Sequence, residues 1–234
     1  MIFGARTTEE TQTSDEREDR RDAPIQPLVD LGSATLKTPH GSVHCLTIVG
    51  QIEGHMALPP GAKATKYEHV LPLLANLEAS EDVRGVLFLL NTMGGDVEAG
   101  LAIAELIAGM TKPTVSLVLG GGHSIGIPLA VASRETFIAP SASMTVHPIR
   151  MNGTMIAAPQ TYHYFSRLQE RIVRFVTKNS RVSEERFTSL MMAAKDMAAD
   201  VGSVIYGEEA VESGLIDRVG TLSDALTALY TRIG

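Results

Sequence analysis

Residues 115–126, VSLVLGGGHSIG, decide the fold that this sequence predicts. The run 115–119 is apolar and rich in branched side chains, which is typical of a buried strand. Three glycines, residues 120–122, end that strand, and Ser124 stands just before the apolar segment 127–133, which reads as a buried helix. Because a helix N-terminus stabilises negative charge, this serine is placed where an oxyanion would be stabilised.

The same alternation of strand and helix appears earlier in the chain. Residues 43–49 and 86–90 are two further apolar runs that read as buried strands, and apolar residues at helical spacing follow each, beginning at Tyr67 and at Val97. Continuous apolar strands separated by helices are typical of a parallel sheet that helices cover on both faces. The sequence therefore predicts an α/β fold, in which Gly94-Gly95 forms a turn where one strand ends.

The C-terminal half is predicted to add two short strands and then mostly helices. The strands are residues 136–139 and 143–147, and the apolar spacing that starts at Tyr162 indicates a long amphipathic helix. Ser183 is predicted to cap the next helix, because two acidic residues follow it. A short helix, a strand and a final helix are expected over residues 207–230.

Composition limits the class of protein. The chain of 234 residues is 44% hydrophobic and has a net charge of −7, which permits a large core and gives a nucleic-acid partner no electrostatic support. The one cysteine, Cys45, excludes an internal disulfide, fits a reducing compartment and is expected to be a small buried side chain. With no apolar run long enough to span a membrane and no secretory signal, the expectation is a soluble cytoplasmic protein.

Charge and polarity divide the chain into two parts. Residues 1–26 lack apolar periodicity and include the charged run DEREDRRD, so they are predicted to form a mobile N-terminal arm. Residues 27–234 contain no internal repeat or linker and are predicted to be one domain. His40 and His44 complete no metal-ligand spacing, and the glycine runs match no phosphate-binding pattern, so neither a metal nor a cofactor is expected.

Ser124 allows three interpretations. It could simply cap the helix that follows it. Residues 122–126 also fit G-x-S-x-G, the nucleophile elbow of α/β-hydrolases, but the last histidine, His163, lies inside a predicted helix and not in the loop which that fold requires. The third interpretation is a nucleophile whose base is His147, at the end of a strand, and whose orienting acid is Asp200.

Two backbone amides are candidates for holding an oxyanion. Neighbouring parallel strands bring their C-terminal ends to one edge, where sites in open α/β sheets lie. The N–H groups of Gly95 and Ile125 would then face the carbonyl oxygen of a substrate. Glycine matters at the first position because a side chain would block close approach of the backbone.

Four segments together resemble the proteolytic subunit of the caseinolytic (Clp) protease family, in order and spacing. They are NTMGGD at 91–96, GHSIG at 122–126, MTVHP at 144–148 and EAVESGLID at 209–217. The resemblance covers residues 43–219, and the details around His123 and residues 144–147 look most similar to the translocation-enhancing (TepA) branch. It implies the ClpP/crotonase-type fold, with repeated ββα units and a protruding handle helix over residues 162–177.

Motif by motif, the resemblance also implies the site. The implied residues are the nucleophile Ser124, the base His147, the oxyanion-hole amides of Gly95 and Ile125, and the acid Asp200, with Asp196 as the alternative acid. Two features depart from the family pattern. Residues 91–95 read Asn-Thr-Met-Gly-Gly where the family usually has Asn-Ser-Pro-Gly-Gly, and a long charged arm replaces the family's short N-terminal gate.

The function expected from this resemblance is that of a serine-type endopeptidase. It would hydrolyse polypeptides inside a homo-oligomeric ring, a heptamer or stacked heptamers. An AAA+ ATPase is a possible partner, and a link to protein export is possible. Two alternatives stay open. One is a non-catalytic ring or scaffold that aids translocation, and the other is a crotonase-like acyl-CoA enzyme, because a paired oxyanion hole also suits a thioester enolate.

Overall fold

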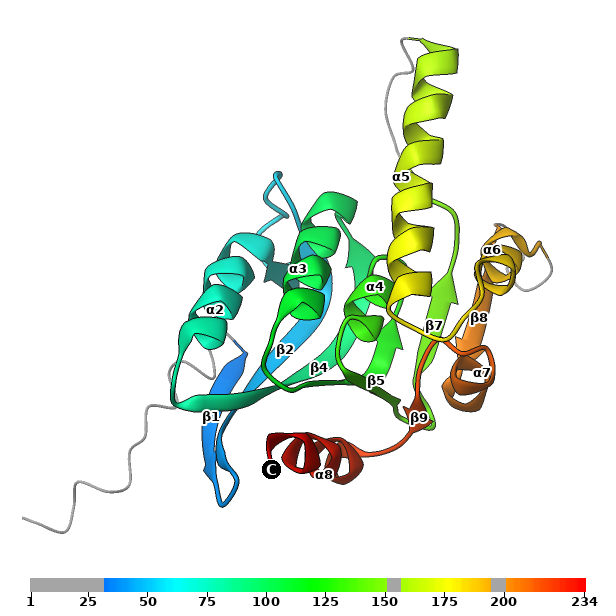
Figure 1. The fold of residues 1–234 in the computed structure, drawn as a ribbon. Helices are drawn as coiled ribbons and strands as arrows, with labels where there is room; N and C mark the ends of the chain where they lie inside the picture. The colour runs from blue at the N-terminus through cyan, green and yellow to red at the C-terminus, as the bar shows by residue number, and fades with distance from the viewer. Residues whose placement is uncertain (1–31, 151–156, 195–200) are drawn as a thin grey trace, which may run out of the picture.

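The computed structural model describes residues 32–150, 157–194 and 201–234 of the chain (Figure 1). The predicted arm, residues 1–26, lies outside these ranges, and so do both candidate acids, Asp196 and Asp200. No helix within the described ranges combines the length and the apolar character needed to cross a bilayer.

Strands and helices alternate through most of the described chain. The strands are β1 (Ser33–Thr38), β2 (Gly41–Glu53), β3 (Ala64–Lys66), β4 (Val83–Gly95), β5 (Thr114–Gly122), β6 (Glu135–Ile138), β7 (Ser143–Val146), β8 (Ser203–Tyr206) and β9 (Arg218–Val219). The helices are α2 (Tyr67–Ala79), α3 (Val97–Gly109), α4 (Gly126–Val131), α5 (Ala158–Lys178), α6 (Glu184–Met192), α7 (Gly207–Glu212) and α8 (Leu222–Ile233). The predicted α/β class is confirmed.

The central sheet has the strand order β1-β2-β4-β5-β6-β9, and β1 is antiparallel to β2 while the other neighbours in this path are parallel. β7 pairs in parallel with β5 at Gly121 and Ser143, and antiparallel with β8. β4 and β5 therefore end side by side, with Thr92 opposite Gly122. This edge brings the two glycine segments together.

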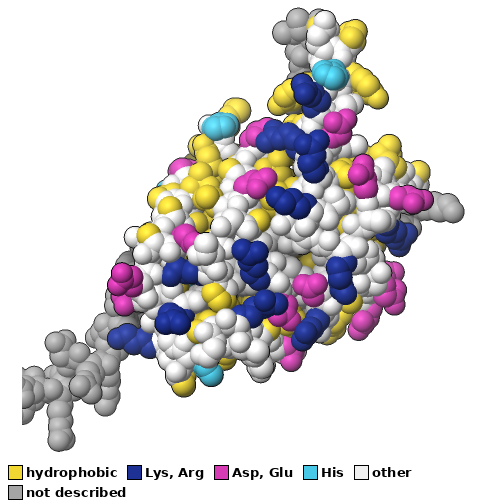
Figure 2. All heavy atoms as spheres, viewed as in Figure 1, with side chains coloured by type: hydrophobic (Ala, Val, Ile, Leu, Met, Phe, Trp, Pro, Cys, Tyr) yellow, Lys and Arg dark blue, Asp and Glu magenta, His cyan; other side chains and the backbone are white. Residues whose placement is uncertain are grey.

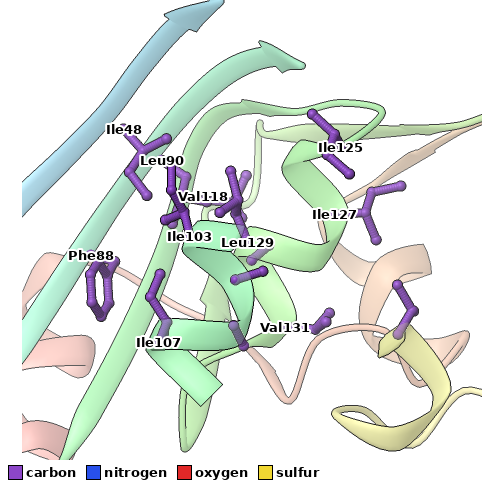
Figure 3. Close-up of a cluster of buried hydrophobic side chains, with 14 of the residues drawn as sticks. Ile48, Phe88, Leu90, Ile103, Ile107, Val118, Ile125, Ile127, Leu129 and Val131 are labelled. Carbon is purple, nitrogen blue, oxygen red and sulfur yellow. The ribbon is translucent and has the colours of Figure 1, made fainter. Parts of the chain in front are cut away.

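Helices cover both faces of the sheet, as the continuous apolar strands predict. Along β4, Phe88 and Leu90 pack on the face covered by α3 and α4, whereas Leu87 packs on the opposite face with Leu229 of α8. Figure 3 shows Phe88 and Leu90 on the strand and Ile103 of α3 packed against them. This rigid sandwich fixes the strand ends at which the candidate site lies.

The structure corrects the sequence prediction at the two glycine segments. Gly94 and Gly95 belong to β4, because β2 continues to Glu53 and pairs with them through Gln51 and Ile52. Residues 120–122 likewise belong to β5. The short strands β1, β3 and β8 carry no clear apolar pattern and are stabilised by pairing to a neighbouring strand, so the sequence did not predict them.

Helix α5 is the protruding handle that the family resemblance predicts (Figure 1). Its base packs through Leu168, Phe175 and Val176, while Tyr162 near its free end is 76% exposed. Figure 2 shows Lys and Arg gathered on the lower part of α5 beside acidic side chains. One such pair is bidentate, because Arg171 donates from Nη1 and Nη2 to Glu98 on α3, at 2.6 and 3.1 Å.

Candidate active site

Ser124 occupies a sharp turn between β5 and α4. Its φ is +56°, and it is the one residue other than glycine with a positive φ in the described ranges. The Ser124 N–H donates to the Thr145 carbonyl at 2.9 Å, and the Gly126 N–H donates to the His123 carbonyl at 2.8 Å. A left-handed conformation costs a serine about 1–2 kcal/mol, and such strain is concentrated at functional sites.

The interpretation of Ser124 as a helix cap is wrong. The N-cap of α4 is Ile125, and no side chain caps that helix. The Ser124 hydroxyl is therefore not used to satisfy the helix N-terminus, and the strained turn instead presents it beside the end of β4.

Gly94 approaches Ser124 so closely that no other residue fits there. A Cβ built on Gly94 would lie 2.7 Å from Ser124 Cβ, 3.2 Å from Ser124 Oγ and 2.9 Å from the His123 carbonyl oxygen. Its φ of +91° is also one that residues with a side chain rarely adopt. The backbone of β4 therefore forms one wall of the space around the hydroxyl.

His147 follows the last residue of β7, and its ring orientation is fixed by the next residue. Nδ1 lies 2.6 Å from the Pro148 carbonyl oxygen. Because a carbonyl can only accept, Nδ1 carries the hydrogen and donates it. A ring that donates from Nδ1 leaves Nε2 as the nitrogen that could accept a proton, which is what a general base requires.

Gly95 pairs with Ile52 of β2 at the end of β4. The next amide along, that of Asp96, donates to the Ile52 carbonyl at 3.0 Å. Because alternate amides of a regular strand point in opposite directions, we expect the Gly95 N–H to point away from β2. No hydrogen bond between described residues uses the N–H of Ile125.

Thr92 braces this end of β4. Its hydroxyl donates to the Gly50 carbonyl at 2.6 Å and accepts from the Gly94 N–H at 3.1 Å. The side chain is only 1% exposed. The threonine thus ties the glycine segment to β2 without the proline that the family usually carries one position later.

One pocket brings the predicted site residues together. A cavity of about 160 Å³ is lined by Gly95, Ser124, Ile125 and His147. Its remaining described walls are mostly apolar, and they are Val97, Ile127, Val146, Pro148, Ile149, Arg150, Ile172, Phe187 and Met191. Asp200 and Asp196, the candidate acids, lie outside the described residues, and His163 is not among the residues that line this cavity.

The sequence did not single out the pocket residues supplied by α5 and α6. Ile172, Phe187 and Met191 were assigned to the apolar faces of helices, which is where core residues also lie. Their spacing gives no sign that these faces border a cavity. Only the packing of the two helices beside β7 shows it.

His123 stands next to the candidate nucleophile and is partly buried. Its Nδ1 lies 2.9 Å from the Thr145 hydroxyl. Burial lowers the pKa of His123, and the neighbouring His147 lowers it further, so both effects favour the neutral His123 ring.

His44 is buried and Cys45 is partly buried. His44 Nδ1 pairs with the Thr35 hydroxyl at 2.8 Å, and burial raises the pKa of the Cys45 thiol, which disfavours the reactive thiolate. Among the residues that the structure describes, no three His, Cys, Asp or Glu side chains are grouped closely enough to hold a metal ion.

The model of the Clp protease family matches residues 40–223. The chain belongs to the Clp protease family. It is 52% identical over 206 residues to "Translocation-enhancing protein TepA" of Halalkalibacterium halodurans, across 88% of this chain and 80% of that protein.

More distant relatives carry the protease name itself. The chain is 28% identical over 153 residues to "ATP-dependent Clp protease proteolytic subunit 1" of Protochlamydia amoebophila, across 61% of this chain and 68% of that protein. It is 24% identical over 181 residues to the "ATP-dependent Clp protease proteolytic subunit" of Streptococcus sanguinis, across 74% of this chain and 83% of that protein. Membership of the Clp family and similarity to TepA, both predicted from four short segments, are confirmed.

Proposed function

We propose that this Clp-family chain is a serine-type endopeptidase. Ser124 attacks the carbonyl carbon of a peptide bond, and His147 Nε2 takes the hydroxyl proton and then gives it to the leaving amine. The observation that carries the proposal is the single pocket lined by Gly95, Ser124, Ile125 and His147. These residues come from three separate segments of the chain, and together they supply a nucleophile, a base and two oxyanion donors.

Charge develops on the carbonyl oxygen in the tetrahedral intermediate. The amides of Gly95 and Ile125 would donate to this oxygen, and losing one such donor typically lowers turnover by ~10²–10³-fold. The imidazolium that forms on His147 needs a partner, and Asp200 is the proposed acid, with Asp196 as the alternative. The mostly apolar walls would hold the substrate side chain next to the scissile bond.

The proposal extends to assembly and cellular context. A homo-oligomeric ring, a heptamer or stacked heptamers, would enclose the sites in a chamber and restrict them to unfolded polypeptides. The relatives named as ATP-dependent protease subunits support a Clp ATPase as the partner that delivers substrate. We place this assembly in the cytoplasm and treat residues 27–234 as one domain with the arm 1–26 outside it.

The test is covalent labelling with a fluorophosphonate probe and cleavage of an unfolded polypeptide by the purified full chain. Ser124→Ala should abolish both. Ser223→Ala changes an exposed serine on α8 and should leave both intact. Labelling of Ser124→Ala at the wild-type rate would refute the proposal.

The name of the TepA relative favours a second candidate, a ring or scaffold that aids protein translocation without cleaving a peptide bond. The two candidates differ in their need for the hydroxyl. Secretion would be measured in cells that lack the protein and carry either the wild-type chain or Ser124→Ala. Full rescue by Ser124→Ala would favour the scaffold, whereas rescue by the wild-type chain alone would favour the peptidase.

A further inference from the structure

His123 is held on two sides by its surroundings. Its Nδ1 pairs with the Thr145 hydroxyl at 2.9 Å. On the other side, a Cβ built on Gly121 would lie 2.5 Å from Nε2 of the ring and 2.7 Å from its Cδ2. The imidazole therefore lies against bare backbone, and the glycine at 121 leaves the room that it needs.

Thr145 receives contacts from two consecutive residues of the turn. Its carbonyl accepts from the Ser124 N–H at 2.9 Å, and its hydroxyl pairs with the His123 ring at the same distance. One residue of β7 is therefore tied to the turn by its main chain and by its side chain.

His147 depends on how β7 is placed, because it lies just beyond the end of that strand. Thr145 and His147 are two positions apart, so their side chains leave the same face of the chain. β7 has only four residues and meets β5 at the single pair Gly121 and Ser143. The ladder to β5 alone is therefore a weak determinant of the position of His147 relative to Ser124.

We propose that the hydrogen bond between His123 and Thr145 is a positioning contact that fixes the register of β7 against the Ser124 turn and so places His147 beside the hydroxyl. His123 acts through Thr145 and does not itself take part in proton transfer. This inference rests on the proposed peptidase function, and it adds a residue whose role the Clp family match does not assign.

The expected effect is on the rate of the chemical step. A displacement of about 1 Å of a catalytic group costs up to ~10²-fold, while the pocket that binds the probe keeps its shape. The first-order rate constant of fluorophosphonate labelling should therefore fall by about 10–100-fold when the hydrogen bond is removed. The concentration of probe that gives half the maximal rate should stay unchanged.

Two variants remove the bond from opposite sides, and two keep it. Thr145→Val and His123→Ala lack it, whereas Thr145→Ser keeps the hydroxyl and His123→Asn keeps a polar atom near the position of Nδ1. We expect the two disrupting variants and their double mutant to lose rate by the same factor, because contacting residues couple. The two conservative variants should stay within about threefold of wild type. Valine is nearly isosteric with threonine, so the labelling rate of Thr145→Val tests the proposal even if His123→Ala does not fold.

Some results would overturn the inference. It fails if the losses from Thr145→Val and His123→Ala add in the double mutant, or if Thr145→Ser labels as slowly as Thr145→Val while unfolding at the wild-type temperature. A wild-type chain that takes no probe refutes the peptidase function instead. In that case the positioning contact is tested by hydrogen exchange. The Ser124 amide should lose its protection from exchange in Thr145→Val and keep it in Thr145→Ser.

Discussion

Gly202 packs directly against His147. A Cβ built on Gly202 would lie 2.9 Å from His147 Cβ and 2.5 Å from the Val146 carbonyl oxygen, and the φ of Gly202 is +143°. Its N–H donates to the Ala193 carbonyl at 2.7 Å, which anchors the entrance to β8. The backbone of Gly202 therefore packs against the proposed base, His147. A glycine has no side chain, so residue 202 cannot supply an orienting acid.

Gly202→Ala should displace His147 without unfolding the chain. The new methyl group would clash with the Val146 carbonyl oxygen and with Cβ of His147, so the end of β7 must shift and carry the imidazole with it. We expect labelling of Ser124 to slow by about 10–100-fold. The measurement is the fluorophosphonate labelling rate together with the unfolding temperature. Gly109→Ala is the matched control, because a Cβ there meets nothing within 4 Å. Equal labelling rates for the two variants would contradict this account of the support.

Thr92→Val should impair the oxyanion donors. The change removes the hydroxyl that links the Gly50 carbonyl to the Gly94 N–H and leaves both groups unpaired. We expect a loss of stability of about 1–3 kcal/mol and a fall in turnover of up to ~10²-fold. Thr92→Ser restores the hydroxyl and should recover most of both. Peptide cleavage and denaturant unfolding are the measurements, and a Thr92→Ser variant as impaired as Thr92→Val would show that the methyl group matters and the hydroxyl does not.

Neutralising each candidate acid in turn should show whether Asp200 or Asp196 assists His147. At rest the Pro148 carbonyl holds the Nδ1 hydrogen of His147, but it carries no charge to stabilise the imidazolium. We expect Asp200→Asn to slow cleavage by at least about 10-fold, towards the ~10⁴-fold seen when a triad acid is neutralised. Asp196→Asn should cleave at the wild-type rate. The measurement is the steady-state cleavage rate of each variant. A slow Asp196→Asn variant and a fully active Asp200→Asn variant would assign the role of the acid to Asp196.

The ion pair at the base of α5 should make a small contribution to stability that depends on pH. The hydrogen bond from Arg171 holds the pKa of Glu98 below its usual range, so the charged pair favours the folded state. This contribution is complete above the ordinary carboxyl pKa and is lost as the pH falls through the lowered value. The two side chains are 47% and 50% exposed, so it amounts to no more than about 1 kcal/mol.

Glu98→Gln tests this pair. The variant should be slightly less stable than wild type at pH 7, and the difference should be smaller at pH 3, as measured by urea unfolding at both values. Glu81→Gln, at an exposed position between α2 and β4, should show no such difference. A destabilisation by Glu98→Gln that is as large at pH 3 as at pH 7 would mean that the carboxylate charge is not its cause.

Local patterns predicted most of the regular structure. The helical spacing that starts at Tyr67 became α2, with Val70, Leu74 and Leu77 buried. Ser183 caps α6 as predicted, because its hydroxyl accepts from the Arg186 N–H at 3.1 Å. The ends of β4 and β5 were harder to predict, since glycines favour turns locally and extend these strands only because neighbouring strands pair with them.

The sequence by itself determined the α/β class, the order of most strands and helices and the family, because apolar periodicity and motif order are properties of the chain read along its length. It also marked Ser124, His147 and the glycine at 95. Only the tertiary structure decided that these residues share a pocket, that Pro148 sets the His147 tautomer and that Gly94, Gly121 and Gly202 pack against site side chains. Such contacts join segments far apart in the chain, and they depend on strand register and backbone conformation, which residue type alone does not specify.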